Sequence, residues 1–263
     1  VQLSPDQDKA LTIITKWLQV PNSKYKYLTL GGYAGTGKTT LIATLRKELQ
    51  KYGKPRIAFC SYTGKAARVL KNKLDDQKAL FPKDYIGTIH ALIYQPVSDE
   101  KGDIIAWTKR DKLYFSLIIV DEASMVNKYV WEDLKSFGIK ILAVGDHGQL
   151  PPIENFKFNL MDKPILRLEK VHRQAADNPI IQIATLAREQ KDIPIKKFNE
   201  SVRKIDKQGW EVNELMQEEF ENFHNDTLIL CGFNATKDNI NNSIRQTKEF
   251  DPLQPEPKDK IIC

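Results

Sequence analysis

The sequence predicts an α/β fold in which a parallel β-sheet is covered by helices on both faces. Three observations lead to this prediction. The chain has 263 residues, of which 41% are hydrophobic, and this is enough for a sizeable core in one or two domains. Short continuous apolar runs, typical of buried parallel strands, alternate with helical patterns. A glycine-rich turn at residues 31–37 joins the first apolar run to a helical pattern.

The individual elements follow from these patterns along the chain. We expect strands at residues 27–30, 56–60, 117–120, 139–144, 165–168 and 227–231. We expect helices at residues 39–51, 64–74, 128–135, 179–189, 212–223 and 237–246. Parallel strands need long crossover connections, and these helical segments supply them.

One insertion interrupts this alternation. Within residues 91–113, the polar segment SDEKG separates two β-like arms, which predicts a hairpin that stands out from the sheet. Residues 190–209 have the composition of a polar connecting region.

The glycine-rich turn has the pattern of a phosphate-binding loop. Residues 32–39 read GYAGTGKT and match G-x-x-x-x-G-K-[ST] in full, after a strand and at the start of a helix. Glycines let backbone N–H groups wrap around phosphate oxygens, and the helix N-terminus adds positive potential. We expect Lys38 to reach the β- and γ-phosphates of a nucleotide and the Thr39 hydroxyl to bind Mg²⁺. The residues expected to contact the nucleotide are Gly32, Ala34, Gly35, Thr36, Gly37, Lys38, Thr39 and Thr40. A glycine-rich turn without a ligand is the alternative, and the complete motif argues against it.

A second motif, LIIVDEAS at residues 117–124, is a strand that ends in two carboxylates. This places Asp121 and Glu122 at the edge of the sheet where such folds bind ligands. We expect Asp121 to hold the Mg²⁺ through water and Glu122 to activate the attacking water. An acidic cap of the next helix is the alternative. A glutamate beside the aspartate favours hydrolysis over phosphoryl transfer to a metabolite.

A third motif, AVGDHGQLPPI at residues 143–153, is a strand that runs into a polar loop. Its Gln149 stands where a side-chain amide could bond to the γ-phosphate. With this motif the chain resembles the superfamily 1 DNA helicases, and specifically the RecD-like 5′→3′ group called superfamily 1B. The resemblance rests on GYAGTGKTT, IIVDEASM, GDHGQLPPI and LEKVHRQ, and it extends to LSPDQDKAL, CSYTGKAARVL, GTIHAL and LCGFNATKDNINNSIR.

The resemblance implies a domain organisation. Residues 1–164 correspond to a P-loop NTPase motor domain of the RecA-like type, with the inserted hairpin at about residues 91–113. Residues 165–263 correspond to the beginning of a second RecA-like domain, without the later motifs of the family. A helicase moves when ATP closes a cleft between two complete motor domains, so we expect this portion not to unwind duplex DNA by itself.

The resemblance also implies roles for individual residues. Gln7 would read adenine, and Arg173 would reach the γ-phosphate from the second motor domain, although an ordinary ion pair is the alternative for Arg173. The residues expected to contact DNA are Ser61, Tyr62, Thr63, Lys65, Thr88, His90, Pro96 and Trp107. Hydroxyls, a helix N-terminus and a lysine after a strand suit DNA phosphates, but a capped helix with a solvated lysine has the same pattern.

Two of these DNA residues carry further alternatives. His90 could have a structural role instead. Trp107 could stack on bases, which is worth ~1–3 kcal/mol per base, or it could close the small core of the hairpin.

The sequence therefore predicts an ATP-dependent DNA helicase that uses ATP and Mg²⁺ and acts on single-stranded DNA and duplex junctions as a monomer, with replication or repair proteins as partners. The net charge of +6 and the pI of about 9.0 are compatible with nucleic acid. A P-loop switch or clamp without unwinding is the first alternative, and a small-molecule kinase is the second.

We expect a cytoplasmic, reducing location without a membrane span. No run of 18 apolar residues and no signal peptide is visible in the sequence. Cys60 and Cys231 lie in apolar runs, which predicts buried free thiols.

Overall fold

The computed structural model describes residues 2–21, 23–53, 55–149, 158–170, 178–189, 191–224, 226–251 and 254–257. The chain divides into two compact units, residues 1–188 and residues 189–263.

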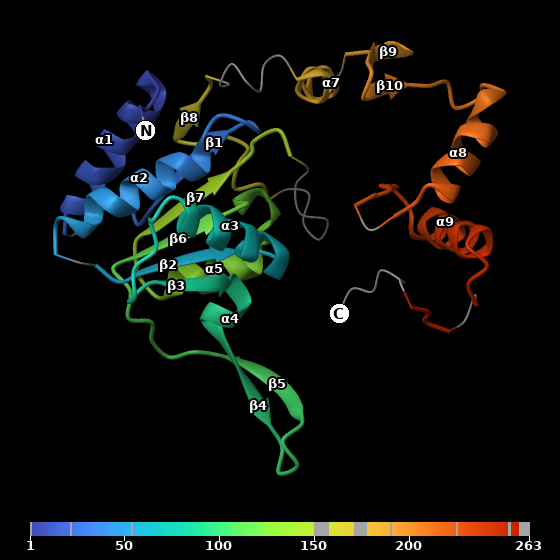
Figure 1. Ribbon diagram of the computed structural model, residues 1–263. Coiled ribbons are helices and arrows are strands. Elements are labelled where there is room, and N and C mark those ends of the chain that lie inside the picture. Colours follow the sequence, from blue (N-terminus) through green and yellow to red (C-terminus); the bar gives the residue numbers. More distant parts are fainter. Residues whose placement is uncertain are drawn as a thin grey trace. The chain divides into compact units, whose positions relative to one another are not determined.

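The first unit is built around a six-stranded sheet with the strand order β3-β2-β6-β7-β1-β8 (Figure 1). All of its strand pairs are parallel, which confirms the predicted α/β fold. Its strands are β1 (Tyr27–Gly32), β2 (Ile57–Ser61), β3 (Tyr85–Thr88), β6 (Leu117–Asp121), β7 (Ile141–Gly145) and β8 (Leu166–Leu168). Its helices are α1 (Pro5–Gln19), α2 (Lys38–Gln50), α3 (Gly64–Asp76), α4 (Ile89–Ile93), α5 (Lys128–Ser136), α7 (Pro179–Arg188) and the 3₁₀ helix η1 (Ala123–Met125).

Two hydrophobic cores lie on the two faces of this sheet. Successive residues of a strand point to opposite faces, so Leu117 and Ile119 of β6 enter one core while Ile118 and Val120 enter the other. The first core contains residues of α1, α2 and α3, and the second contains residues of α4 and α5. Burial on both faces explains why these strands read as continuous apolar runs.

A buried ion pair fixes α2 at the edge of the sheet. The Arg46 guanidinium donates two hydrogen bonds to the Asp84 carboxylate, at 2.8 and 3.1 Å. The same carboxylate accepts from the backbone N–H groups of Ile57 and Phe81. Since both charges are buried, removing one partner would leave an uncompensated charge inside the protein. The pair holds α2, the helix that follows the phosphate loop, against β2.

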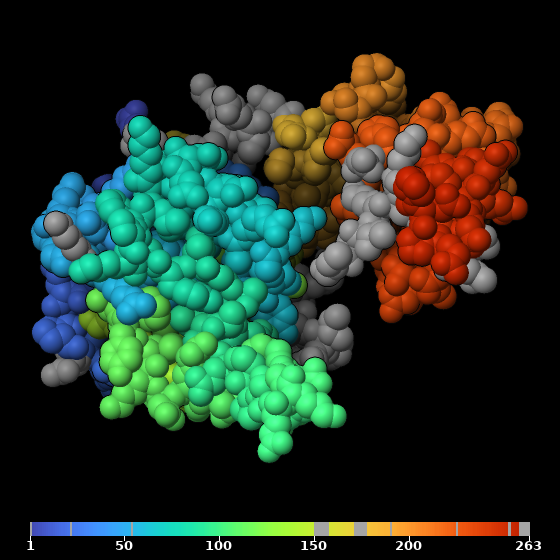
Figure 2. All heavy atoms as spheres, turned by 60° about the horizontal axis from the view of Figure 1, so that its bottom comes forward, coloured from blue at the N-terminus to red at the C-terminus, as the bar shows by residue number. Residues whose placement is uncertain are grey.

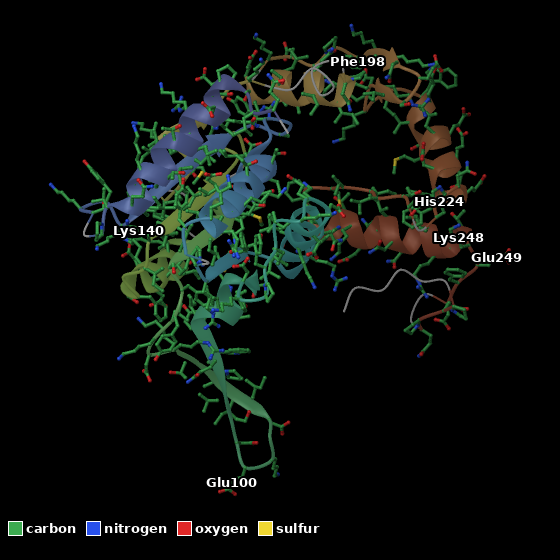
Figure 3. The ribbon with its side chains drawn as sticks, turned by 60° about the vertical axis from the view of Figure 1, so that its left-hand side comes forward. Glu100, Lys140, Phe198, His224, Lys248 and Glu249 are labelled. Atoms are coloured by element: carbon green, nitrogen blue, oxygen red, sulfur yellow. The ribbon has the colours of Figure 1, made fainter. Side chains whose placement is uncertain are left out.

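The predicted hairpin is present. Strands β4 (Tyr94–Ser98) and β5 (Ile104–Lys109) pair antiparallel, and they form a separate two-stranded sheet. Figure 1 shows the hairpin extending away from the six-stranded sheet, and Figure 3 shows Glu100 at its far end. In the space-filling view its residues form a projection at the lower edge of the first unit (Figure 2).

The second unit contains β9 (Lys196–Asn199), β10 (Val202–Lys204), α8 (Glu211–Glu221) and α9 (Asn234–Thr247). Strands β9 and β10 form an antiparallel ribbon within the region predicted to be a polar connection. Few of the described residues of this unit are buried; Phe220 and Ile244 are among those that are.

The boundary between the units differs from the expected one after residue 164. Strand β8 pairs with β1 through Leu166 and Leu168, so this segment completes the first sheet. The unit then ends at Arg188, after α7. An apolar run such as 165–168 predicts a strand but does not say which sheet it joins.

The strand predicted at residues 227–231 is not formed: the side chains there are exposed or half-buried, and no strand of the described residues pairs with them. Accordingly, Cys231 is exposed, which corrects the prediction of a buried thiol, whereas Cys60 is buried. Among the described residues, no helix is both long and apolar enough to span a bilayer.

Candidate nucleotide site and neighbouring DNA-binding residues

The phosphate loop connects the end of β1 to the start of α2, as predicted. Gly35 and Gly37 have φ angles of 81° and 77°, in the left-handed region where a side chain would be strained. A Cβ atom on Gly32 would lie 2.5 Å from the Thr36 hydroxyl oxygen, so only glycine fits at this turn. The Thr36 hydroxyl donates to the Tyr33 carbonyl at 2.8 Å and closes the loop.

The Lys38 ammonium lies over this loop. Its Nζ donates to the carbonyls of Gly32, at 2.6 Å, and Tyr33, at 3.0 Å. Burial lowers the pKa of Lys38, while the carboxylates of Asp146, Glu122 and Asp121 act in the opposite direction. The ammonium is therefore a cation that anionic side chains surround, at the N-terminus of a helix, where phosphate groups bind well.

The two carboxylates of the second motif lie at the end of β6. Burial, with a further contribution from Glu122, raises the pKa of Asp121 to about 6. Glu122 has a left-handed backbone with a φ of 54°, and its Oε2 atom is buried without a hydrogen-bond partner. A non-glycine residue in this conformation is strained, and such strain is concentrated at functional sites.

These oxygens suit a magnesium ion. Mg²⁺ is usually held by one or two carboxylates together with substrate phosphates, and it keeps several of its waters. Asp121 supplies a buried carboxylate whose charge a cation would stabilise, and the Thr39 hydroxyl lines the same cavity. No group of three or more His, Cys, Asp and Glu side chains suited to a metal occurs among the residues that the structure describes.

Gln149 joins the loop after β7 to the loop after β6. Its Oε1 atom accepts a hydrogen bond from the Ser124 hydroxyl at 2.9 Å. Asp146 shapes the same turn, because its carboxylate accepts from the Gly148 N–H at 2.8 Å. The amide that was predicted to meet the γ-phosphate is thus bonded to the loop that carries Glu122.

A cavity of about 780 Å³ gathers these groups. It is lined by Lys38, Thr39, Asp121, Glu122 and Gln149, together with other residues of the phosphate loop. The structure therefore brings together the predicted residues of all three motifs at the carboxyl edge of the sheet.

One wall of this cavity was not predicted. Helix α3 contributes Ala66, Leu70 and Lys73 to it, and Gln77, which caps the helix, also lines it. These residues recur at spacings of three and four, so they share one face of the helix. The pattern was visible in the sequence, but it could equally describe a face packed on the core. Lys73 adds a second cation beside Lys38 and Asp121, and no ion pair of Lys73 occurs in the described part of the chain.

Gln7, in the first turn of α1, is 1% exposed and contacts the phosphate loop. Its Oε1 accepts from the Ser4 N–H at 2.9 Å, and its Nε2 donates to the Thr36 carbonyl at 3.0 Å. At the other end of α1, the Lys140 ammonium donates to the carbonyls of Trp17, Leu18 and Val20. These bonds show Gln7 supporting the loop. Its predicted contact with adenine remains a prediction.

The residues predicted to contact DNA have different environments. Ser61 is fully buried and its hydroxyl has no partner, so it offers no surface to a DNA phosphate in this structure. Thr63 and Thr88 cap α3 and α4 by accepting from the N–H groups of Ala66 and Ala91, each at 3.2 Å. Their hydroxyls thus have the structural role that the capped-helix alternative describes.

Several other predicted DNA residues lie near each other. The ring of His90 packs against Tyr62, with centroids 5.7 Å apart. On the hairpin, Pro96 lies opposite Trp107, and the Trp107 side chain is 61% exposed. A side chain this exposed does not close a hairpin core, which leaves its ring accessible for stacking. Lys65 and Thr63 line the nucleotide cavity as well.

Arg173, with Pro151 and Pro152, lies outside the described residues.

Two side chains, those of His147 and Arg188, pack against the ring of Tyr33, which follows Gly32 in the phosphate loop. The His147 ring is 4.2 Å from it and the Arg188 guanidinium is 4.3 Å from its centre. Burial lowers the pKa of His147, whose Nδ1 atom is buried without a partner. These neighbours of the loop were not predicted.

Comparisons with known proteins show which family the chain belongs to and which proteins it is similar to. A family model described as an AAA domain matches residues 2–210. The ATP-dependent RecD2 DNA helicase of Deinococcus radiodurans is 32% identical over 161 residues, which are 59% of this chain and 20% of that protein. The RecD subunit of the RecBCD enzyme of Buchnera aphidicola is 33% identical over 139 residues, covering 47% of this chain and 23% of the relative.

The match to the ATP-dependent DNA helicase Pif1 of Campylobacter jejuni is longer. The two are 28% identical over 239 residues, which are 82% of this chain and 50% of that helicase. This chain thus spans half or less of the length of each of these three relatives. The matches confirm the resemblance to RecD-like helicases of superfamily 1B that the motifs indicated.

Proposed function

Because this chain belongs to the AAA domain family, we propose that its cavity is the ATP site of a DNA helicase motor. The observation that carries the proposal is that Lys38, Thr39, Asp121, Glu122 and Gln149 line one cavity at the carboxyl edge of a parallel sheet. Ligands of such folds bind at this edge. The relatives named RecD2 and Pif1 are ATP-dependent DNA helicases, which supports this choice among P-loop enzymes.

The phosphate loop would hold the triphosphate. The N–H groups at the start of α2 and the Lys38 ammonium would bond to its oxygens, and Lys38 would leave the carbonyls of Gly32 and Tyr33 to do so. Thr39 and Asp121 would hold the Mg²⁺. A bound Mg²⁺ supplies charge neutralisation across the β- and γ-phosphates.

Glu122 would orient and activate the water that attacks the γ-phosphate. Its Oε2 atom is buried and has no hydrogen-bond partner among the residues that the structure describes, so a water on the cavity side is a suitable donor to it. Glu122 and Asp121 are adjacent but act differently, because one meets water and the other meets the metal. This carboxylate favours hydrolysis of ATP over transfer of its γ-phosphate to a small molecule.

Gln149 and Ser124 would communicate the state of the nucleotide. Their hydrogen bond joins the loop after β7 to the loop that follows Glu122. If Gln149 turned to a γ-phosphate, this bond would be lost, and the two loops would separate. Such a change is a route by which hydrolysis could alter other parts of the motor.

Single-stranded DNA would run past the ends of β2 and β3 and reach the hairpin. Tyr62, His90 and Trp107 are the residues on which this proposal depends, with Pro96 beside Trp107 at a duplex junction. We further infer that residues 189–263 begin a second motor domain, and that Arg173, which precedes this unit in the sequence, reaches the γ-phosphate of ATP. The polarity would be 5′→3′, as in the family that the motifs resemble. We also propose that the protein acts as a monomer in the reducing interior of the cell. Its partners would be replication or repair proteins.

ATP hydrolysis with and without single-stranded DNA tests the function. The chain is expected to hydrolyse ATP slowly alone and faster with an oligo-dT, and K38A is expected to be inactive in both conditions. An unchanged rate on addition of DNA would favour a switch or clamp. Transfer of the γ-phosphate to a small metabolite instead of water would favour a kinase.

A further inference from the structure

One carboxylate, that of Asp133, contacts both strands at the root of the hairpin. Asp133, on α5, accepts a hydrogen bond from the Tyr94 hydroxyl at 2.5 Å through Oδ2. Its other oxygen, Oδ1, lies 3.3 Å from the Lys109 ammonium. Tyr94 is the first residue of β4 and Lys109 is the last of β5, and the two are paired in register. Asp133 therefore contacts both strands of the hairpin at the point where they leave the body of the unit.

Neighbouring groups complete this attachment. Lys109 also donates to the Ser136 hydroxyl at 3.2 Å, and that hydroxyl donates to the Asp133 carbonyl at 2.7 Å. The Arg110 N–H donates to the Ile93 carbonyl at 2.9 Å, which closes the backbone across the two strands. Beyond this root, all residues of β4 and β5 are exposed. The direction of the projecting hairpin thus depends on few contacts.

The same tyrosine continues a row of rings. The Tyr94 ring lies 5.8 Å from His90, and His90 lies 5.7 Å from Tyr62. Tyr62 and His90 are residues that the proposed function places along the DNA. Asp133 holds one end of this row through the Tyr94 hydroxyl, so it affects the ring positions as well as the hairpin.

Helix α5 also connects this attachment to the nucleotide site. Glu122 and η1 are followed, after Val126 and Asn127, by α5, which begins at Lys128 and carries Asp133 in its second turn. A rigid helix transmits a displacement of its first turn to its later turns. A shift of the loop that carries Glu122 would therefore reach the hairpin root through α5.

We propose that Asp133 is a positioning residue that orients the β4–β5 hairpin and the Tyr62–His90–Tyr94 row for DNA. The part of this proposal that concerns DNA rests on the proposed function. Asp133 does not touch DNA in this account, and it acts through Tyr94 and Lys109. The Asp133 and Lys109 side chains are 35% and 42% exposed, and exposed pairs contribute little to stability. Its role is orientation, and the fold is expected to survive its removal.

The variants are D133A, which removes both contacts, and Y94F, which removes only the hydroxyl. E132A is the matched control, because Glu132 is the preceding residue on α5 and pairs with Lys135 of the same helix at 2.9 Å. Thermal unfolding of all three is measured first, and similar melting temperatures are expected.

The first test needs no activity. Spin labels are placed at the hairpin turn with E100C and on α2 with K47C, in a C231S and C263S background. The parent chain is expected to give one narrow distance distribution between the labels. D133A should lose this narrow peak, Y94F should lose part of it, and E132A should keep it. Equal widths in D133A and E132A would overturn the proposal.

The second test uses ATP hydrolysis stimulated by oligo-dT. D133A is expected to raise the DNA concentration for half-maximal stimulation about threefold or more, as expected for the loss of about 0.7 kcal/mol of positioning. The DNA-free rate should be unchanged in D133A and in E132A. An unchanged half-maximal concentration in D133A would contradict the role toward DNA. If no variant, nor the parent, responds to DNA, the proposed function fails, while the distance distributions still decide whether Asp133 orients the hairpin.

Discussion

Among the single residues, Glu122 has the central role in the proposed hydrolysis of ATP. It combines a left-handed backbone with a buried carboxylate oxygen that has no partner. Such strain and such an unsatisfied group each cost on the order of 1–3 kcal/mol. Since this strain and this unsatisfied oxygen destabilise the fold, they are better explained by a catalytic role of Glu122 than by a structural one.

The first prediction therefore concerns E122Q. The amide keeps the size of the side chain but cannot accept a proton from water, so ATP should still bind while turnover falls on the order of 100-fold or more. Binding is followed with a fluorescent ATP analogue and turnover by phosphate release. K38A is the contrasting variant, which should lose turnover and weaken nucleotide binding. Turnover by E122Q at the parent rate would show that Glu122 does not activate the water.

The second prediction concerns how the raised pKa of Asp121 affects the free energy of unfolding of the protein. Its pKa in the folded protein is raised from 3.8 to about 6 by burial and by Glu122. Between these values the folded protein binds more protons than the unfolded chain, so the free energy of unfolding falls as the pH rises from about 4 to about 6. D121N has no charge to bury. Its stability relative to the parent should increase from pH 4 to pH 7, by on the order of 2 kcal/mol.

Chemical denaturation in EDTA at the two pH values measures this difference. D121N should also lose Mg²⁺-dependent hydrolysis at every pH. A stability difference between D121N and the parent that does not change with pH would contradict the assigned shift.

The third prediction separates the two roles of Gln7. Its amide supports the phosphate loop through the Thr36 carbonyl, so Q7A should lower the free energy of unfolding by about 1–2 kcal/mol. If Gln7 also reads the base, Q7A should raise the KM for ATP more than the KM for GTP, because the amide offers a donor and an acceptor that match adenine. Equal changes in both KM values would limit Gln7 to its support of the loop.

The residues of the three motifs could be predicted because their chemistry requires a fixed order and spacing. Lys38, Thr39, Asp121 and Glu122 all follow strands of one parallel sheet, and the ends of such strands meet at one edge. The burial of Ser61 could not be predicted, since a serine at the end of a strand reads the same whether it faces the neighbouring strand or solvent. Lys73 was missed because its helical spacing from Ala66 and Leu70 also fits a packed face.

Among the elements, the hairpin is the one most exposed to a partner. Trp107 is 61% exposed opposite Pro96. The fourth prediction is that W107A weakens binding to single-stranded oligo-dT by the loss of about 1–3 kcal/mol of stacking, while ATP hydrolysis without DNA is unchanged. Fluorescence anisotropy measures the affinity. A large drop in the melting temperature of W107A would instead assign Trp107 to a core.

The sequence predicted most elements of the first unit and both helices of the second unit, α8 and α9, but it did not predict strands β9 and β10. The strands of the sheet are buried on both faces, so β6 and β7 read as long apolar runs. Strand β3 was missed, because all four of its residues are only half-buried at the edge of the sheet. The segment at residues 227–231 reads as a strand, but its side chains are exposed or half-buried and find no partner strand. An apolar run becomes a strand only where a sheet is present to pair with it.

At the scale of the whole molecule, the proposed function requires that the first unit couples the nucleotide site to the DNA-binding residues. The nucleotide cavity and the Tyr62–His90–Tyr94 row both belong to the first unit, whose sheet places β2 and β6 side by side. Binding of ATP can change the affinity for DNA only if ATP favours one arrangement of these elements over another, and the reverse effect must be equal.

The affinity of E122Q for a fluorescent oligo-dT, with and without ATP and Mg²⁺, is the most direct test of this claim, since E122Q should hold ATP without turnover. The account predicts that ATP changes the dissociation constant by about fivefold or more, which corresponds to a coupling free energy of about 1 kcal/mol. It also predicts that K38A, which binds ATP poorly, shows no change. The same dissociation constant for E122Q in the presence and absence of ATP, with ATP binding verified independently, would contradict the account.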